Sequence, residues 1–151
     1  MQNLEIVLCQ KEWIPYAAVL AGRLWPHDAL PELERELFLL EESHRGVIFL
    51  ARQRENWIGY AQCQLRFDYV EGTGTSPVGY LEGIYVEPAY RRQGVARSLL
   101  EACEAWAQTQ GCTEFASDTE VSNSESRKFH KNTGFEEAAE IVHFRKKLGN
   151  G

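Results

Sequence analysis

A short turn between an apolar strand pattern and a long helical pattern constrains this chain more than any other feature. The turn reads Tyr-Arg-Arg-Gln-Gly-Val-Ala over residues 90–96. Amides that fold inward around an anion need small side chains, which Gly94 and Ala96 supply. The following helix adds N–H groups and the positive end of its dipole, while Arg91 and Arg92 add fixed positive charge. The sequence predicts a pyrophosphate cradle, with an ordinary strand-to-helix turn as the alternative.

The spacing of this turn excludes two commoner phosphate loops. A P-loop needs a Lys-Ser/Thr pair after its last glycine, and a dinucleotide site needs G-x-G-x-x-G near the start of a βαβ unit. Neither pattern is present here. Arg-x-x-Gly-x-Ala after a strand instead resembles the acetyl-CoA pyrophosphate loop of the GNAT superfamily of N-acetyltransferases. The resemblance implies a cofactor contact for each residue of the loop, namely Arg91, Arg92, Gln93, Gly94, Val95 and Ala96.

A second motif follows in the order expected for that superfamily. Asn123 precedes His130 by seven positions, and Gly134-Phe135 closes the segment. This resembles the GNAT helix in which an asparagine precedes an aromatic acid, usually tyrosine. The resemblance implies that Asn123 hydrogen-bonds the cofactor and that His130 protonates the departing CoA thiolate. A helix cap at Asn123 and a packed or exposed histidine are the structural alternatives.

The hydrophobic periodicity predicts a mixed α/β fold. Strand patterns cover residues 4–8, 46–52, 57–67, 79–86 and 114–118. Helical patterns cover 12–25, 31–43 and 122–132, and a further helix follows the turn and runs to residue 110. The order strand, helix, strand after residue 79 implies a parallel pair with a right-handed crossover. The resemblance implies the GNAT acyltransferase fold, in which a mostly antiparallel sheet carries one splayed parallel strand pair and flanking helices.

One further strand pattern is expected at residues 141–148. Many GNAT domains end with two strands, so this chain would leave a sheet edge unpaired. We therefore expect a second subunit to cover that edge, which makes a homodimer.

The bulk composition fits a single globular domain over residues 1–151, with 44% hydrophobic and 25% charged residues. No apolar run is long enough to span a membrane, and the N-terminus lacks the pattern of a signal peptide, so a cytoplasmic protein is expected. A net charge of −6 argues against nucleic acid as a partner.

The four cysteines have neither CxxC spacing nor histidines placed to complete a zinc site. They are expected to be buried, reduced thiols, and no metal is implied.

Within the superfamily, the chain closely resembles the aminoglycoside 6′-N-acetyltransferases. The resemblance is carried by residues 81–86, 91–96 and 116–119, and further by 23–26 and 67–70. It implies transfer of acetyl from acetyl-CoA to the 6′-amine of an aminoglycoside by direct attack in a ternary complex, and with it antibiotic resistance. An acetyltransferase for polyamine or peptide amines and a non-catalytic acyl-CoA-binding sensor are the alternatives.

Two acids are placed for this chemistry. An ammonium group must lose a proton before it attacks a thioester, which requires a nearby carboxylate. Glu82 interrupts an apolar strand just before the cofactor loop, and Asp118 ends the next strand at the carboxyl edge, where open α/β sheets bind ligands. Together they would attract a polycation, and their proximity would raise the pKa of one of them. A surface acid and a turn cap are the alternatives.

The remaining site residues are apolar or aromatic. The resemblance implies that backbone groups around Ile84 and Val86 pair with pantetheine as an added strand would, and that a free N–H on this strand stabilises the oxyanion. Trp25 and Tyr69 could form walls that hold sugar rings, although both could equally be buried aromatics.

Overall fold

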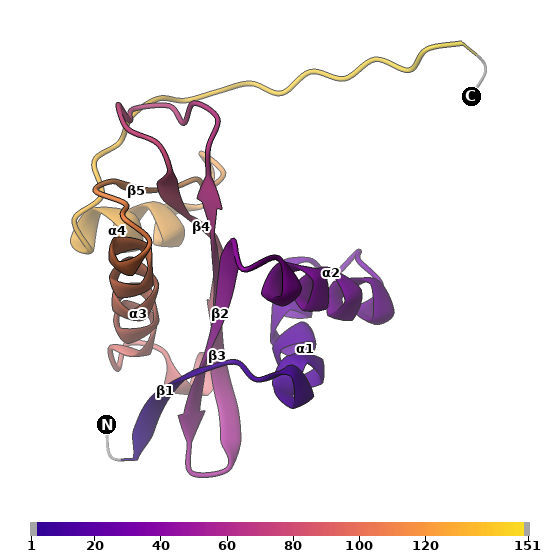
Figure 1. The fold of residues 1–151 in the computed structure, drawn as a ribbon. Helices are drawn as coiled ribbons and strands as arrows, with labels where there is room; N and C mark the ends of the chain where they lie inside the picture. The colour runs from indigo at the N-terminus through magenta and orange to yellow at the C-terminus, as the bar shows by residue number, and fades with distance from the viewer. Residues whose placement is uncertain (1–2, 150–151) are drawn as a thin grey trace. The chain divides into compact units, whose positions relative to one another are not determined.

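The computed structural model describes residues 3–149, which form two compact units, 3–118 and 119–149. Figure 1 shows the course of the chain. The first unit holds five strands, three α-helices and two short 3₁₀ helices, and the second holds one α-helix. In chain order they are β1 (Leu4–Leu8), η1 (Lys11–Trp13), α1 (Ile14–Leu24), α2 (Leu30–Ser43), β2 (Gly46–Gln53), β3 (Asn56–Arg66), β4 (Val78–Val86), η2 (Pro88–Tyr90), α3 (Val95–Thr109), β5 (Phe115–Ser117) and α4 (Ser124–Asn132).

The sheet of the first unit has the order β1-β2-β3-β4-β5. The first three pairs are antiparallel, and β4 with β5 is parallel, so the predicted mixed sheet is confirmed. The parallel register ends at Leu81 opposite Ser117. Since β4 continues to Val86, the second half of β4 lies beyond the end of its parallel neighbour. The strand pair is therefore splayed, as expected.

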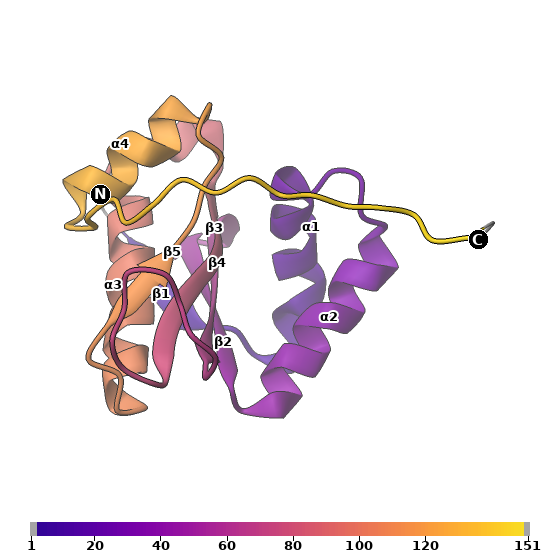
Figure 2. The ribbon, with the colours of Figure 1, turned by 90° about the horizontal axis from the view of Figure 1, so that it is seen from above.

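Helices cover both faces of this sheet. α1 and α2 pack on one face, and α3 packs on the opposite face against β2, β3 and β4 (Figures 1 and 2). α2 begins with a proline in its first turn, where the missing N–H costs nothing. α1 is preceded by the 3₁₀ turn η1, so the predicted helix over 12–25 is regular only from Ile14.

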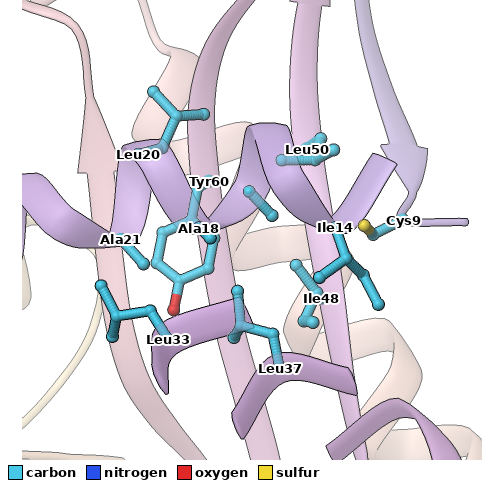
Figure 3. Close-up of a cluster of buried hydrophobic side chains, with 11 residues drawn as sticks. Cys9, Ile14, Ala18, Leu20, Ala21, Leu33, Leu37, Ile48, Leu50 and Tyr60 are labelled. Atoms are coloured by element: carbon cyan, nitrogen blue, oxygen red, sulfur yellow. The ribbon is translucent and has the colours of Figure 1, made fainter. Parts of the chain in front are cut away.

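The face under α1 and α2 carries one hydrophobic core. Tyr60 lies fully buried at its centre, and small alanines on α1 let the helix approach the sheet closely (Figure 3). The cysteines at positions 9, 63, 103 and 112 are free and buried, which confirms the expected reduced thiols. Their burial shows that they serve as small apolar side chains.

The expected strand over residues 141–148 is wrong. Residues 135–148 have no regular secondary structure. The apolar side chains of Ile141, Val142 and Leu148 are exposed, and Phe144 is 91% exposed. The segment has the composition of a strand, but a strand forms only when its backbone pairs with a neighbour, and the described chain gives it none.

The parallel pairing of β5 depends on close approach at Gly79. A Cβ atom at this position would meet Phe115 Cδ1 at 2.6 Å and the Cβ of Ala107 at 2.7 Å. Both neighbours belong to packed elements, so neither can move away without loss of packing.

Replacing Gly79 with alanine should therefore lower the free energy of unfolding by about 1–3 kcal/mol through overpacking. Gly74→Ala is the matched control, because a Cβ there meets nothing within 4 Å. We expect the control to change stability by less than about 0.5 kcal/mol. Urea unfolding followed by circular dichroism measures both, and equal stabilities would contradict the close approach.

Candidate active site

A bulge in β4 determines where Glu82 points. Opposite β3, Gly83 pairs with Gln62 and Leu81 pairs with Cys63, so Glu82 is the extra residue. A bulge breaks the alternation of side chains along a strand and turns one of them to a new direction. Glu82 and Gly83 consequently both face Trp25: Glu82 lines a cavity with it, and a Cβ on Gly83 would meet its ring at 2.7 Å.

This cavity has a volume of ≈ 170 Å³ and an acidic lining. Its walls come from the loop after α1, from α2 and from the middle of the sheet. The lining residues are Trp25, Asp28, Leu33, Glu36, Leu37, Gln62 and Glu82. A lining of three carboxylates with one indole and two leucines favours a ligand that carries several cationic groups on an apolar frame.

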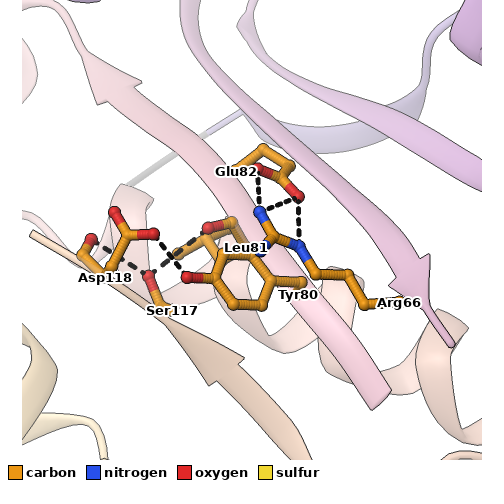
Figure 4. Close-up of polar contacts among 6 residues, drawn as sticks. All are labelled: Arg66, Tyr80, Leu81, Glu82, Ser117 and Asp118. Carbon is orange, nitrogen blue, oxygen red and sulfur yellow. Dashed lines mark hydrogen bonds and ion pairs between the residues drawn. The ribbon is translucent and has the colours of Figure 1, made fainter. Parts of the chain in front are cut away.

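Glu82 is held by an arginine from the neighbouring strand. Arg66 Nη2 donates to Glu82 Oε1 and Oε2, each at 3.0 Å, and Arg66 Nε donates to Oε2 at 3.2 Å (Figure 4). The Glu82 side chain is only 19% exposed. A planar guanidinium that grips a carboxylate in this way fixes its orientation as well as its charge.

Asp118 joins the same group of side chains through Tyr80. The Tyr80 hydroxyl donates a hydrogen bond to Asp118 Oδ2, and the Arg66 guanidinium lies over the Tyr80 ring with its Cζ 3.4 Å from the ring centroid (Figure 4). The two predicted acids therefore stand at the ends of one connected network, with Arg66 and Tyr80 between them.

Burial is the largest influence on the protonation of Glu82. Desolvation raises the pKa of this carboxyl above its usual value, and the negative charge of Asp118 acts in the same direction. The hydrogen bonds and charge of Arg66, with a smaller effect from Gln64, oppose this rise without cancelling it. Burial and the hydrogen bond to Asp118 also raise the pKa of Tyr80, which keeps its hydroxyl protonated.

The loop before α3 has the backbone of an anion site. Gly94 occupies the N-cap of α3 with φ +82°, and no side chain caps the helix there. The first amides of a helix have no intrahelical acceptor, so they can donate to a ligand. Arg91 is turned back onto the strand, where its Nε donates to the Val86 carbonyl at 2.8 Å. This contact ties the loop to the end of β4.

The edge of β4 beside this loop lies beyond the parallel pairing. Ile84 and Val86 pair with Ala61 and Gly59 of β3, and the described register of β5 stops at Leu81. An extended ligand can therefore lie along the edge of β4 and use its backbone groups as an added strand would.

Asn123 and His130 belong to the second unit, and each contacts residues of that unit. Asn123 caps α4, since its Oδ1 accepts from the Ser126 amide at 3.1 Å. The His130 Nδ1 lies 2.7 Å from the Ser126 carbonyl, and its ring packs beside Phe129 and Phe135. A carbonyl can only accept, so Nδ1 carries the proton in this contact.

Only one of the two aromatic residues predicted to hold sugar rings lines the cavity. Trp25 lines the cavity, whereas Tyr69 is 75% exposed on the loop after β3 and is absent from the cavity lining. Sequence reasoning missed Arg66, Asp28 and Glu36. The importance of Asp28 and Glu36 can be recognised only when α2 is known to face Glu82. That of Arg66 can be recognised only when the register between β3 and β4 is known.

Within residues 3–149, no group of His, Cys, Asp or Glu side chains is arranged to hold a metal ion. The same part of the chain contains no helix that is both long and apolar enough to cross a membrane.

An open strand edge beside an uncapped helix start is the arrangement expected of an acyl-CoA-dependent transferase. The family model described as Acetyltransferase (GNAT) family matches residues 9–135. The chain belongs to this family, as its sequence motifs predicted.

Curated relatives from several bacteria carry the name aminoglycoside N(6′)-acetyltransferase type 1. The protein from Acinetobacter haemolyticus is 41% identical over 138 residues, which cover 91% of this chain and 92% of that protein. The protein from Stenotrophomonas maltophilia is 44% identical over 128 residues, which cover 83% of this chain and 81% of that protein.

Solved structures of similar proteins give the same picture. Aminoglycoside N-acetyltransferase AAC(6′)-Iy in complex with CoA superimposes with a TM-score of 0.92 at 34% identity, covering 96% of this chain and 95% of that one. AAC(6′)-Iy with the bisubstrate analogue CoA-S-monomethyl-acetylneamine gives 0.93 at 33% identity, covering 97% and 100%. Structural neighbours of this chain therefore bind CoA, the acyl carrier of the family.

Proposed function

We propose that this protein transfers an acetyl group from acetyl-CoA to the 6′-amine of aminoglycosides, and so confers resistance to them. The observation that carries the proposal is the half-buried Glu82, which the β4 bulge turns into an acid-lined cavity. Aminoglycosides are rigid frames with several ammonium groups, which matches three carboxylates around apolar and indole surfaces. The names of the relatives support the same substrate.

The reaction proceeds by direct attack in a ternary complex. Glu82 accepts a proton from the substrate ammonium, directly or through water, and the free amine attacks the thioester carbonyl. The N–C bond forms, the C–S bond breaks and the electron pair leaves with the sulfur. Asp118 and Trp25 hold the substrate, with Tyr69 as a further contact on the rim. His130 supplies the proton that the CoA thiolate takes up, and the second proton of the attacking nitrogen leaves to solvent as the amide forms.

The cofactor is bound mainly by backbone. Residues 91–96 and the start of α3 hold the pyrophosphate, the edge of β4 at Ile84 and Val86 pairs with pantetheine, and Asn123 contributes a hydrogen bond. A free N–H of β4 stabilises the oxyanion of the tetrahedral intermediate. No metal takes part in this scheme.

Residues 1–151 work as one catalytic domain, since the family match at 9–135 runs through the junction between the two compact units. The four free cysteines suit a reducing compartment, which supports a cytoplasmic location.

The first test is CoA release by purified protein with kanamycin, a 6′-hydroxy aminoglycoside or spermidine as acceptor. Turnover restricted to 6′-amino compounds is expected, and Glu82→Gln should lower kcat/KM by about 10²–10³-fold, because the general base is lost. Glu55→Gln, an exposed acid in the β2–β3 turn, is the control and should match wild type. Turnover of spermidine alone would make the protein a polyamine acetyltransferase, and CoA binding without turnover would favour a sensor.

The cradle is tested at the two ends of α3. Gly94 and Gly111 both have positive φ, at +82° and +90°, and a Cβ on either meets nothing within 4 Å. Alanine at either position carries a similar strain of about 1–2 kcal/mol. Only Gly94→Ala should raise the Kd for CoA, by about tenfold, when measured by calorimetry. An equal change in Gly111→Ala would point to general destabilisation.

The protein assembles as a homodimer through its C-terminal segment. The support is the exposed apolar series at residues 141–148 together with β5, which pairs with β4 alone in the described sheet. A second copy offers these exposed apolar side chains a surface against which they can be buried.

Light scattering should give a dimer for the wild type and a monomer for the double variant Ile141→Asp, Phe144→Asp, because the charges prevent burial of the segment. Glu140→Lys, which changes charge without removing apolar surface, should remain dimeric. A monomeric wild type at micromolar concentration would refute the assembly.

A further inference from the structure

The contact between Arg66 and Glu82 sets an arginine against the carboxylate that is to accept a proton. Its two guanidinium nitrogens reach both carboxylate oxygens at 3.0–3.2 Å. The guanidinium also lies on the Tyr80 ring. A side chain held at both its face and its edge has little freedom, so the contact is a fixed part of the site (Figure 4).

The bulge explains why Glu82 needs this contact with Arg66, which we call the arginine clamp. An extra residue in a strand lacks the cross-strand partner that would fix its direction, so the Glu82 side chain needs another support. Arg66 is the last residue of β3, across the sheet from Val78. From this end of the strand the long arginine side chain reaches the bulge and holds the carboxylate there.

We propose that Arg66 is a positioning residue of the active site, which orients the Glu82 carboxylate, keeps it ionised in its half-buried position and links it through Tyr80 to Asp118. This inference rests on the proposed role of Glu82 as the base. Arg66 touches neither of the reacting atoms and acts through the acids.

The surrounding charges determine in which direction the loss of Arg66 would shift the pKa of Glu82. Asp118 faces Glu82 across the network, and Asp28 and Glu36 line the same cavity from the α1–α2 side. The phenols of Tyr80 and Tyr60 and the thiol of Cys63 are further titratable groups that interact with Glu82. Arg66 is the cation among these groups that bonds to Glu82, so without it burial and the neighbouring acids would favour the protonated carboxyl.

The test compares Arg66→Met, Arg66→Lys and Arg45→Met. Methionine keeps the bulk of the side chain without the charge, and lysine keeps the charge without the fork. Arg45 is the control, because it stacks on the Phe67 ring at 4.8 Å in a similar way. Two readouts are used: the pH profile of kcat/KM, and the titration of the Glu82 carboxyl carbon by NMR, assigned with Glu82→Gln.

In Arg66→Met the pKa of Glu82 should rise by about one unit or more, since an adjacent arginine normally lowers it by about 1–3 units. Activity requires the ionised carboxylate, so the acid limb of the profile should move to higher pH by the same amount. Activity should recover at high pH. Arg66→Lys should fall between Arg66→Met and wild type, and Arg45→Met should not shift the limb.

An unchanged Glu82 midpoint in Arg66→Met would overturn the inference, as would an activity loss that is equal at every pH. The NMR readout is independent of the acceptor. If wild type fails to acetylate aminoglycosides while the Glu82 midpoint still moves in Arg66→Met, the proposed function fails and the clamp on Glu82 stands.

Discussion

One additional residue in β4 determines the geometry of the candidate active site. Without the bulge at Glu82, strict alternation along the strand would place the carboxylate and Gly83 on opposite faces of the sheet. With it, the acid enters the cavity under Trp25, and the missing side chain of Gly83 leaves room for the indole. The direction of the Glu82 side chain and the room for the Trp25 ring both follow from this local change in register.

The electrostatic balance at the site is a compromise between burial and pairing. A fully solvated glutamate would be too weak a base near neutral pH, and a buried glutamate without a partner would remain protonated. Glu82 lies between these limits, because desolvation raises its pKa and the arginine clamp limits the rise. The position of each strand relative to its neighbour sets this balance, since Arg66 and Glu82 are sixteen residues apart in the chain.

The sequence predicts the strands and helices well because their hydrophobic periods are long and regular, as in α3 and β4. It also singles out Glu82, an acid in an apolar strand, which the structure places in the lining of the cavity. It does not reveal Arg66, Asp28 or Glu36, because their importance arises from the register of β3 and from the packing of α2. Residues 141–148 have the composition of a strand but form none. Composition alone does not predict a strand, because a strand also needs a neighbouring backbone with which to pair.

The acids of the cavity come from separate parts of the chain. Asp28 precedes α2 and Glu36 lies within it, whereas Glu82 belongs to the sheet. Substitutions in the α1–α2 region can therefore alter the number and spacing of the cations that fit the cavity while β4 keeps its geometry. Under the proposed function, acceptor range and acetyl transfer would then be set by separate parts of the chain.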